Sequence, residues 1–315
     1  MAGNTFGTLF RLTTYGESHG PGLGGVVDGC PPGIPLDEAM IQAELDRRKP
    51  GGTAASTTRK EPDTVRLLSG VFEGATTGTP IAFHIENQDQ RSKDYSAIKD
   101  LFRPGHADLT FAAKFGVRDH RGGGRASGRE TVSRVAGGAV ALALLAGHGI
   151  SVLAYTLELG GIPAALQDPE GAQDRAFFSP DPEAPAKWEA RIREVKSAGD
   201  SLGGIVQVEA RGVPAGLGEP VFDKLDARLA YALMGVGAVK AVEIGAGLAA
   251  ARSTCSANND PITPGGFASN HAGGILGVIS CGAPLIARAA VKPIPSIAIE
   301  QQTVTRGGQA TIIKT

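Results

Sequence analysis

The sequence predicts an α+β fold built on antiparallel sheets. Strand-like segments come mostly in adjacent pairs, and such pairing favours antiparallel sheets over a doubly wound parallel sheet. Hydrophobic residues make up 42% and charged residues 20% of the 315 residues, as is typical of a soluble globular protein. No stretch has the composition of a linker. We therefore expect residues 1–315 to form a single domain.

The first predicted elements are two strands and a helix. Thr8–Thr13 and Leu23–Asp28 have strand-like composition and are separated by a glycine-rich turn. Asp37 is expected to open a helix that ends at Arg48, because apolar residues recur at helical spacing and basic residues occupy the last turn. The apolar positions are Met40, Ile41 and Leu45.

A second strand pair and a long helix follow. Thr64–Phe72 and Thr79–Ile85 are predicted to pair around the turn at Gly74–Gly78. The polar segment from Asn87 to Gly105 is expected to be a long surface loop, and such loops are more often functional than idle. Gly128–Gly147 is rich in alanine and glycine and predicts one helix made of small residues.

The rest of the chain continues with strands and helices. In chain order we expect a strand at 150–158, a helix at 183–196, a strand at 204–210, a helix at 223–234 and a strand at 238–244. Two final strands, Ile275–Ser280 and Pro284–Val291, are predicted to form a hairpin.

Charge and cysteine content exclude several classes of protein. The formal net charge of −1 argues against a nucleic-acid partner, because domains that bind nucleic acid are usually basic overall. Cys30, Cys255 and Cys281 are too far apart for a metal site or a disulfide framework, so we expect no metal and a reducing compartment. The N-terminus lacks a signal peptide, and no stretch is long and apolar enough to span a membrane. We therefore expect a cytoplasmic protein without a membrane partner.

The most informative stretch runs from Arg103 to Arg134. It holds six arginines, one lysine and two histidines against three acidic residues, and it includes three successive glycines within Arg121–Arg125. Guanidinium groups suit carboxylates and phosphates, and glycines let backbone N–H groups approach an anion closely. An ordinary charged surface would mix in lysine and glutamate and would not need the glycines. We therefore predict a site for a small polyanion.

Two other motifs match known patterns formally, but we do not expect them to have the corresponding function. Gly20–Gly25 matches the dinucleotide fingerprint formally, but a strand follows where that fingerprint needs the N-terminus of a helix. Arg121–Arg125 is similar to an RGG segment, but RNA-binding versions recur in polar, disordered contexts with aromatic residues. An RNA-binding protein is one alternative to an enzyme.

Two histidines in glycine contexts are candidates for acid–base chemistry. His19 lies at the exit of a predicted strand, where a side chain can project into a cleft or simply satisfy the local turn. His106 follows Pro104 and Gly105 and is expected at the N-cap of a short helix, whose dipole would favour a neutral imidazole. With the neighbouring arginines, these histidines suggest proton transfer on an anionic substrate.

Five blocks of the sequence resemble the signatures of the chorismate synthase family, in the family's order. They are Gly16–Pro31, Arg103–Asp108, Gly124–Gly138, Gly212–Asp223 and Asn270–Ile275, and the likeness runs along the whole chain. The resemblance implies a β–α–β sandwich with helices between antiparallel sheets, assembled as a homotetramer. It also implies a lyase of the shikimate pathway of aromatic amino acid biosynthesis. This lyase converts 5-enolpyruvylshikimate 3-phosphate to chorismate by a 1,4-anti elimination of phosphate and requires reduced FMN. A flavin-phosphate binder without catalysis is a further alternative to an enzyme.

The resemblance implies catalytic roles for four residues. His19 is expected at the substrate phosphate, and His106 at the flavin, where it would manage a proton on the reduced ring. Ser18 and Ser127 are similar to polar groups that line the family's pocket. Departure of phosphate from an allylic carbon needs cationic support and proton donation, which arginines and a histidine can supply.

The resemblance also implies binding positions. Arg48 and Arg129 are similar to substrate-clamping arginines, and the position of Arg48 is also linked to NADPH in members that reduce their own flavin. The Lys292 ammonium is an expected contact of the FMN phosphate. The implied flavin-binding positions are Arg125, Ala126, Ser127, Gly237, Ala238, Gly277, Lys292, Pro293, Ile294, Pro295 and Ser296.

This sequence departs from the family pattern at three places. Ala54 stands where many members have an arginine, which weakens nicotinamide binding there. Val278 and Cys281 lie where the family often has glycine, serine or asparagine, and a valine could crowd the backbone approach at Gly277. The family continues past Lys314 into a block that contributes an arginine to FMN and an aspartate to proton transfer. We therefore expect this 315-residue chain to keep the fold and to have little or no turnover.

Overall fold

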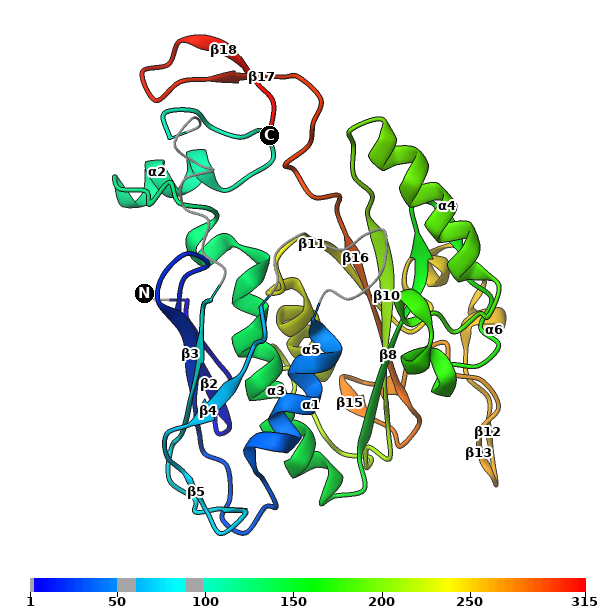
Figure 1. Cartoon of the computed structure of the whole chain (residues 1–315). Coiled ribbons are helices and arrows are strands. Elements are labelled where there is room, and N and C mark those ends of the chain that lie inside the picture. The colour runs from blue at the N-terminus through cyan, green and yellow to red at the C-terminus, as the bar shows by residue number, and fades with distance from the viewer. Residues whose placement is uncertain (1–2, 50–60, 89–98) are drawn as a thin grey trace. The chain divides into compact units, whose positions relative to one another are not determined.

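The computed structural model describes residues 3–49, 61–88 and 99–315 of the chain, and Figure 1 shows their arrangement into helices and strands. The chain forms two compact units. Unit 1 comprises Met1–Gly147, Ala198–Asp200 and Pro295–Thr315, and unit 2 comprises His148–Ser197 and Ser201–Ile294. Each unit has its own five-stranded sheet. The expectation of one family domain over residues 1–315 stays a prediction.

The sheet of unit 1 is antiparallel and has the strand order β1–β2–β3–β7–β4. Its strands are β1 (Thr5–Phe6), β2 (Arg11–Gly16), β3 (Gly22–Asp28), β4 (Val65–Leu67) and β7 (Ile81–Glu86). The formal dinucleotide fingerprint falls in β3, which confirms the strand predicted there. Along β7, buried Ile81, Phe83 and Ile85 alternate with more exposed residues, because one face of the sheet packs on a core.

Two helices, α1 (Glu38–Arg48) and α3 (Thr131–Ala146), cover one face of this sheet (Figure 1). Asp37 caps α1 by accepting a hydrogen bond from the Met40 N–H at 2.8 Å, which confirms the predicted start of the helix. The small residues of α3 allow a close approach to the sheet. A Cβ atom on Gly137 would come within 2.7 Å of the Leu12 side chain.

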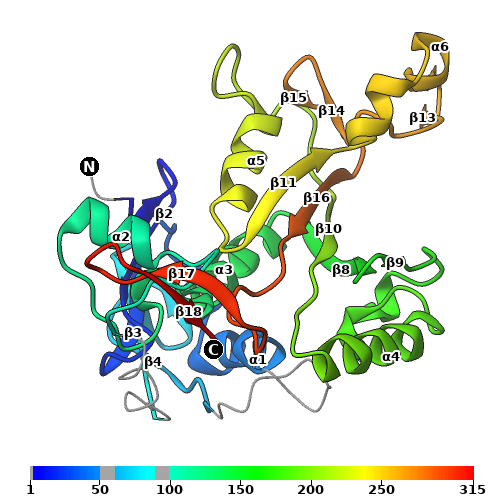
Figure 2. The same cartoon turned by 90° about the horizontal axis from the view of Figure 1, so that it is seen from above.

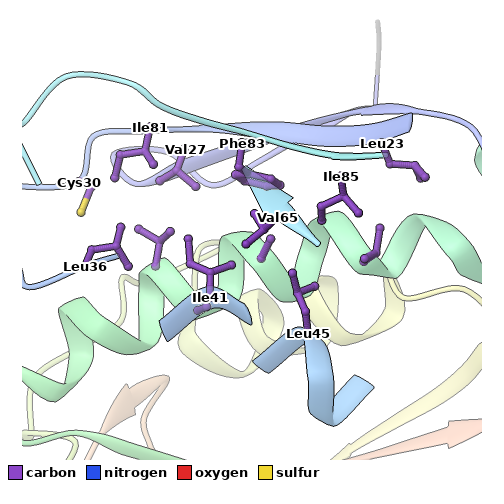
Figure 3. Close-up of a cluster of buried hydrophobic side chains, with 14 residues drawn as sticks. Leu23, Val27, Cys30, Leu36, Ile41, Leu45, Val65, Ile81, Phe83 and Ile85 are labelled. Carbon is purple, nitrogen blue, oxygen red and sulfur yellow. The ribbon is translucent and has the colours of Figure 1, made fainter. Parts of the chain in front are cut away.

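The core of unit 1 fills the space between this sheet and the two helices. Figure 3 shows Val27 and Phe83 from the strands with Ile41 and Leu45 from α1. All four side chains are fully buried and belong to one apolar cluster. This packed layer holds the strand ends and helix ends on which most candidate site residues of unit 1 lie.

The remaining elements of unit 1 are short. They are β5 (Val71–Phe72), β6 (Ala75–Thr76), α2 (Asp108–Phe115), the 3₁₀ helices η2 (Gly124–Ala126) and η3 (Gly128–Glu130), β17 (Gln301–Val304) and β18 (Ala310–Ile313). The β17–β18 hairpin, which the sequence analysis did not predict, holds the segment before α2. Leu101 forms a β-bridge with Thr305, and the Phe102 N–H donates to the Val304 carbonyl at 3.3 Å.

Unit 2 has a second antiparallel sheet with the strand order β11–β16–β10–β8–β9. Its strands are β8 (Ser151–Leu159), β9 (Ile162–Pro163), β10 (Gly204–Arg211), β11 (Val239–Ile244) and β16 (Leu285–Val291). Helix α5 (Leu225–Met234) lies beside β11 and β16, and α4 (Ala184–Ser197) contacts β9 (Figure 2). The smaller elements are η4 (Glu170–Asp174), η5 (Ala176–Phe178), η6 (Gly247–Arg252), α6 (Cys255–Asn258), β12 (Ile262–Thr263), β13 (Gly266–Phe267), β14 (Ile275–Leu276) and β15 (Ile279–Ser280).

The α+β class with antiparallel sheets is confirmed, since every strand pair among the described residues is antiparallel. The predicted hairpin of Ile275–Ser280 with Pro284–Val291 is wrong. β14 pairs with β15 through a two-residue turn, and β16 instead pairs with β10 and β11. Both turn residues, Gly277 and Val278, have positive φ (54° and 74°), as a type I′ turn requires.

Candidate active site

Ser18 and His19 lie in the tight connection between β2 and β3 of unit 1. Asn87, just past the end of β7, holds this connection through its side-chain amide. Its Nδ2 donates to the carbonyls of Glu17 at 3.0 Å and Gly20 at 2.8 Å. Ser18 is buried and His19 is half-buried, so the sheet presents the histidine at a fixed strand end.

The glycine-rich loop 121–127 packs directly on Ser18 and His19. A Cβ atom on Gly122 would lie 2.8 Å from His19 Nε2 and 3.1 Å from Ser18 Oγ. The end of this loop turns into η3, where Ser127 Oγ accepts a hydrogen bond from the Arg129 N–H at 3.3 Å. The structure therefore brings Ser18, His19 and Ser127 into one region, as the resemblance implied for the catalytic groups.

We expect Gly122→Ala to lower kcat/KM by about a hundredfold, because its Cβ would displace the His19 ring and misplacements of about 1 Å cost on that order. The matched control is Gly124→Ala in the same loop. Both glycines have positive φ (81° and 51°), so both variants carry similar backbone strain, but a Cβ on Gly124 meets only Glu17 at 4.0 Å. Steady-state kinetics of the two variants decide the matter. Equal losses in both would show that backbone strain, and not His19, explains the effect.

Arg125 fastens the same loop to β2. Its guanidinium donates to Thr14 Oγ1 at 2.6 Å and to the Gly16 carbonyl at 3.1 Å. Among the described residues no carboxylate forms an ion pair with Arg125, so its positive charge is compensated only by neutral acceptors. Such a cation suits an anionic ligand. Ala126 follows it in η2 and is exposed.

Arg48 and Arg129 meet at a shared carboxylate. Arg48 ends α1 and donates from Nη1 to Asp63 Oδ2 at 2.8 Å, and Arg129 in η3 pairs with the other oxygen of Asp63. Arg129 also donates from Nε to Asn87 Oδ1 at 3.1 Å. Because Asn87 also holds the His19 connection, the two implied substrate arginines and His19 belong to one hydrogen-bonded assembly.

His106 lies in a second buried cluster, around Asp108. His106 Nδ1 is 2.9 Å from Asp108 Oδ1 and 3.1 Å from Arg103 Nη2. Arg103 binds Asp108 through Nε at 2.8 Å and Nη2 at 2.9 Å, and Arg118 adds a further contact at 3.1 Å. Burial raises the pKa of Asp108, but the hydrogen bonds from Arg103 and His106 outweigh burial and hold that pKa well below its ordinary value.

The predicted position of His106 at a helix N-cap is corrected by one residue. The N-cap of α2 is Ala107, and no side chain caps this helix end. Asp108 occupies the first turn of α2 instead, where a carboxylate interacts favourably with the helix dipole. The physical reason is that Arg103 and His106 bind Asp108 and fold the chain back before the helix begins.

Carboxylates neutralise more of the arginine charge at the predicted polyanion site than the sequence suggested. Asp63 forms ion pairs with Arg48 and Arg129. Glu61 also pairs with Arg129, at 3.8 Å, and Asp119 pairs with Arg121 on the surface. An excess of positive charge remains in two places. Arg103 and Arg118 share the single carboxylate of Asp108, and Arg125 forms no ion pair with a described residue.

Six of the implied flavin-binding residues belong to unit 2. Two of them are joined by a backbone hydrogen bond, and two are glycines with open space above their backbone. The Lys292 N–H donates to the Ala238 carbonyl at 2.9 Å, which brings these two segments side by side. Gly237 and Gly277 have no atom within 4 Å of a Cβ position, so a flat ligand could approach their backbone. These residues fit a flavin. The six are Gly237, Ala238, Gly277, Lys292, Pro293 and Ile294.

Pro295 and Ser296 belong to unit 1. A Cβ on Gly105 would lie 3.2 Å from the Pro295 side chain, so Pro295 is close to the His106 segment, while Ser296 is exposed. Of the departures from the family pattern, Ala54 lies outside the described residues. Val278 has positive φ (74°), and apart from its chain neighbours no atom lies within 4 Å of a Cβ position on Gly277.

Asp63, Asn87 and the role of Asp108 were missed by the sequence analysis. Asp108 lies in the Arg103–Asp108 block, and its spacing to Arg103 and His106 could have indicated its role. Asp63 and Asn87 flank long polar segments and carry no local signal. Among the described residues, no three His, Cys, Asp or Glu side chains are grouped so that they could hold a metal ion. In the same part of the chain, no helix has the length and apolar character needed to cross a membrane.

Comparisons with known proteins show which family the chain resembles. The profile of the chorismate synthase family matches residues 10–315. A chorismate synthase from Nitratidesulfovibrio vulgaris (Hildenborough) is 72% identical over 313 residues, covering 99% of this chain and 88% of the relative. One from Oleidesulfovibrio alaskensis is 70% identical over the whole chain and 89% of the relative. A crystal structure of a chorismate synthase superimposes with a TM-score of 0.76 at 35% identity, over 91% of this chain and 86% of that chain, which confirms the predicted fold. The chain therefore belongs to the chorismate synthase family of lyases.

Proposed function

We propose that this protein converts 5-enolpyruvylshikimate 3-phosphate to chorismate by a 1,4-anti elimination of phosphate. The observation that carries the proposal is the contact network of unit 1. Asn87 joins the His19 connection to Arg129, Gly122 packs on His19, and Arg103 donates to the Gly122 carbonyl at 3.2 Å while contacting His106. Membership in the family identifies the proposed substrate, and the network contains the cationic and acid–base groups that this reaction needs.

The residues of unit 1 suit an elimination of phosphate. Arg48 and Arg129 bind anionic groups of the substrate, and His19 donates a proton to the departing phosphate. His106 holds or moves a proton through Nε2, because Nδ1 donates its hydrogen bond to Asp108. Ser18 and Ser127 line the same region. Cationic and proton-donating groups placed before the reaction stabilise the charge that develops on the leaving oxygen.

Reduced FMN, when bound, supplies electron density to the elimination without net redox change. In unit 2, the Lys292 ammonium is the proposed contact of its phosphate. In unit 1, Arg125 is a proposed contact of the flavin in its own right, because it is a cation in a glycine-rich loop. Gly237, Ala238 and Gly277 offer backbone that a flat ring can approach. The other proposed contacts are Ala126, Ser127, Pro293, Ile294, Pro295 and Ser296. NADPH as the flavin reductant, near Arg48, belongs to the same proposal.

The proposal includes a cytoplasmic homotetramer in which residues 1–315 form one family domain. Exposed apolar side chains on unit 2 support self-association. Val221, Phe222, Tyr231 and Ile262 are all more than half exposed, and Phe222 is 92% exposed. Val221 and Phe222 are neighbours in the chain, and contiguous exposed apolar surface is typical of protein–protein contacts. Sedimentation velocity measures the oligomeric state directly.

The deciding experiment is an anaerobic assay of phosphate release with reduced FMN and 5-enolpyruvylshikimate 3-phosphate. Since relatives are longer than this chain, the assay uses both this chain and a form continued with the remaining segment of the N. vulgaris relative. We expect the continued form to release phosphate, and to do so only when both the substrate and reduced FMN are present. Absence of phosphate release from both forms would reject the proposal. Tight, salt-sensitive retention of RNA in a filter assay would instead favour a nucleic-acid binder.

A further inference from the structure

A buried carboxylate lies between the two arginines of the proposed substrate site. Asp63 precedes β4 by two residues and is 0% exposed. Its Oδ2 accepts from Arg48 Nη1 at 2.8 Å, and its Oδ1 pairs with Arg129 Nη1. One carboxylate therefore bridges guanidinium groups from two separate elements, the last turn of α1 and η3.

The backbone of Asp63 is held independently of the two arginines. Gln42 on α1 donates from Nε2 to the Asp63 carbonyl at 3.3 Å, and its Oε1 accepts from the Val65 N–H at 3.0 Å. Asp63 has φ of 50°, a left-handed conformation that aspartate and asparagine tolerate better than most residues. The carboxylate is therefore a fixed point to which the arginines bind.

Arg129 is only 7% exposed, and one of its donor nitrogens is bound by neither Asp63 nor Asn87. Nη1 pairs with Asp63 and Nε donates to Asn87 Oδ1. Nη2 is buried, forms no hydrogen bond with a described residue and lies 3.8 Å from the Glu61 carboxylate. A buried donor without an acceptor is costly, so such a donor is expected where a ligand supplies the acceptor.

We infer that Asp63 is a positioning residue that sets the spacing and orientation of Arg48 and Arg129 for one anionic group of the substrate. The identity of the substrate rests on the proposed function, but the geometry does not. Two guanidinium groups bound to the same carboxylate would otherwise repel each other. The shared carboxylate cancels this repulsion and fixes both planar groups, because guanidinium forks bind carboxylate oxygens in a defined orientation. Asp63 acts through the arginines and does not contact the substrate.

The test is Asp63→Asn, which keeps the size of the side chain and the tolerance of positive φ but removes the charge. We expect KM for 5-enolpyruvylshikimate 3-phosphate to rise by about ten- to a hundredfold, since hydrogen bonds to charged groups contribute on that scale, with kcat changed much less. The matched control is Asp28→Asn, which removes an exposed carboxylate paired with Arg11 in the same sheet. The control should leave KM unchanged.

A second measurement separates this inference from the proposed function. Crystal structures of the wild type and of Asp63→Asn give the positions of Arg48 and Arg129 without any assay. We expect both guanidinium groups to move apart in the variant. If the wild type shows no turnover but the arginines move, the proposed function fails and the positioning role stands. Unmoved arginines overturn the inference whatever the kinetics, and so does an unchanged KM in an active enzyme.

Asp63→Asn removes the negative charge that Arg48 and Arg129 share, and this loss could prevent folding. In that case the double variant Asp63→Asn/Arg48→Gln restores the charge balance. Its crystal structure reports on Arg129 alone, which keeps its hydrogen bond to Asn87. A displaced Arg129 guanidinium in the double variant supports the inference, and an Arg129 in its wild-type position contradicts it.

Discussion

His106→Ala should lower kcat by about 10²–10⁴-fold, the usual contribution of a general acid–base group, and should change KM for the substrate little. The reason is the geometry of the imidazole. Nδ1 donates to Asp108, which fixes the ring and leaves Nε2 for proton transfer. The fold should persist, because Asp108 retains its contacts with Arg103 and Arg118 in the variant. Steady-state kinetics with reduced FMN, in the form of the protein that turns over, provide the measurement.

Two further variants sharpen this test. His106→Gln can still hydrogen-bond to Asp108 but cannot transfer a proton, so we expect it to be as inactive as His106→Ala. His148→Ala removes an exposed histidine beyond the end of α3 and should leave kcat unchanged. Near-normal activity of His106→Gln would make His106 a structural contact of Asp108 and remove it from the proposed chemistry.

The elements with local signals were predicted from the sequence. Asp37 and the spacing of Met40, Ile41 and Leu45 marked α1, and the small residues of α3 marked a helix close to a sheet. The pairing of β16 was not predicted, because nothing local distinguishes a hairpin partner from a strand far away in sequence. β16 pairs with β10 and β11. The predicted strand Ile275–Ser280 is instead two short strands joined by a turn at Gly277 and Val278.

The sequence predicted those candidate site residues that lie in recognisable motifs. The sequence marked His19, His106 and the arginines, and the structure gathers those of unit 1 into connected contacts. The groups that hold them were not predictable. Asp63 acts by its burial and its positive φ, and Asn87 acts through hydrogen bonds to backbone carbonyls about 70 residues earlier. Neither property leaves a pattern in a single sequence.

Asp108→Asn should lower the free energy of unfolding by about 3–5 kcal/mol at pH 7. Arg103 and Arg118 are both at least nine-tenths buried, and Asp108→Asn would remove the anion that both buried cations bind. The control is Asp223→Asn, whose ion pair with Arg228 is exposed and should contribute less than about 1 kcal/mol. Urea denaturation of the wild type and both variants measures these differences. Equal losses in the two variants would contradict a special role for the Asp108 cluster.

The same cluster predicts how stability depends on pH. The ordinary pKa of an aspartate is about 3.9, and the contacts of Arg103 and His106 hold the pKa of Asp108 below that value in the folded protein. The carboxylate therefore stabilises the fold fully above about pH 4, and this contribution is lost as the pH falls below that point toward the lower folded pKa. Unfolding free energies measured from pH 7 down to pH 2 should fall more steeply for the wild type than for Asp108→Asn. The difference between the two proteins should consequently narrow below about pH 4, and a difference that stays constant across the range would show that Asp108 acts through packing and not through its charge.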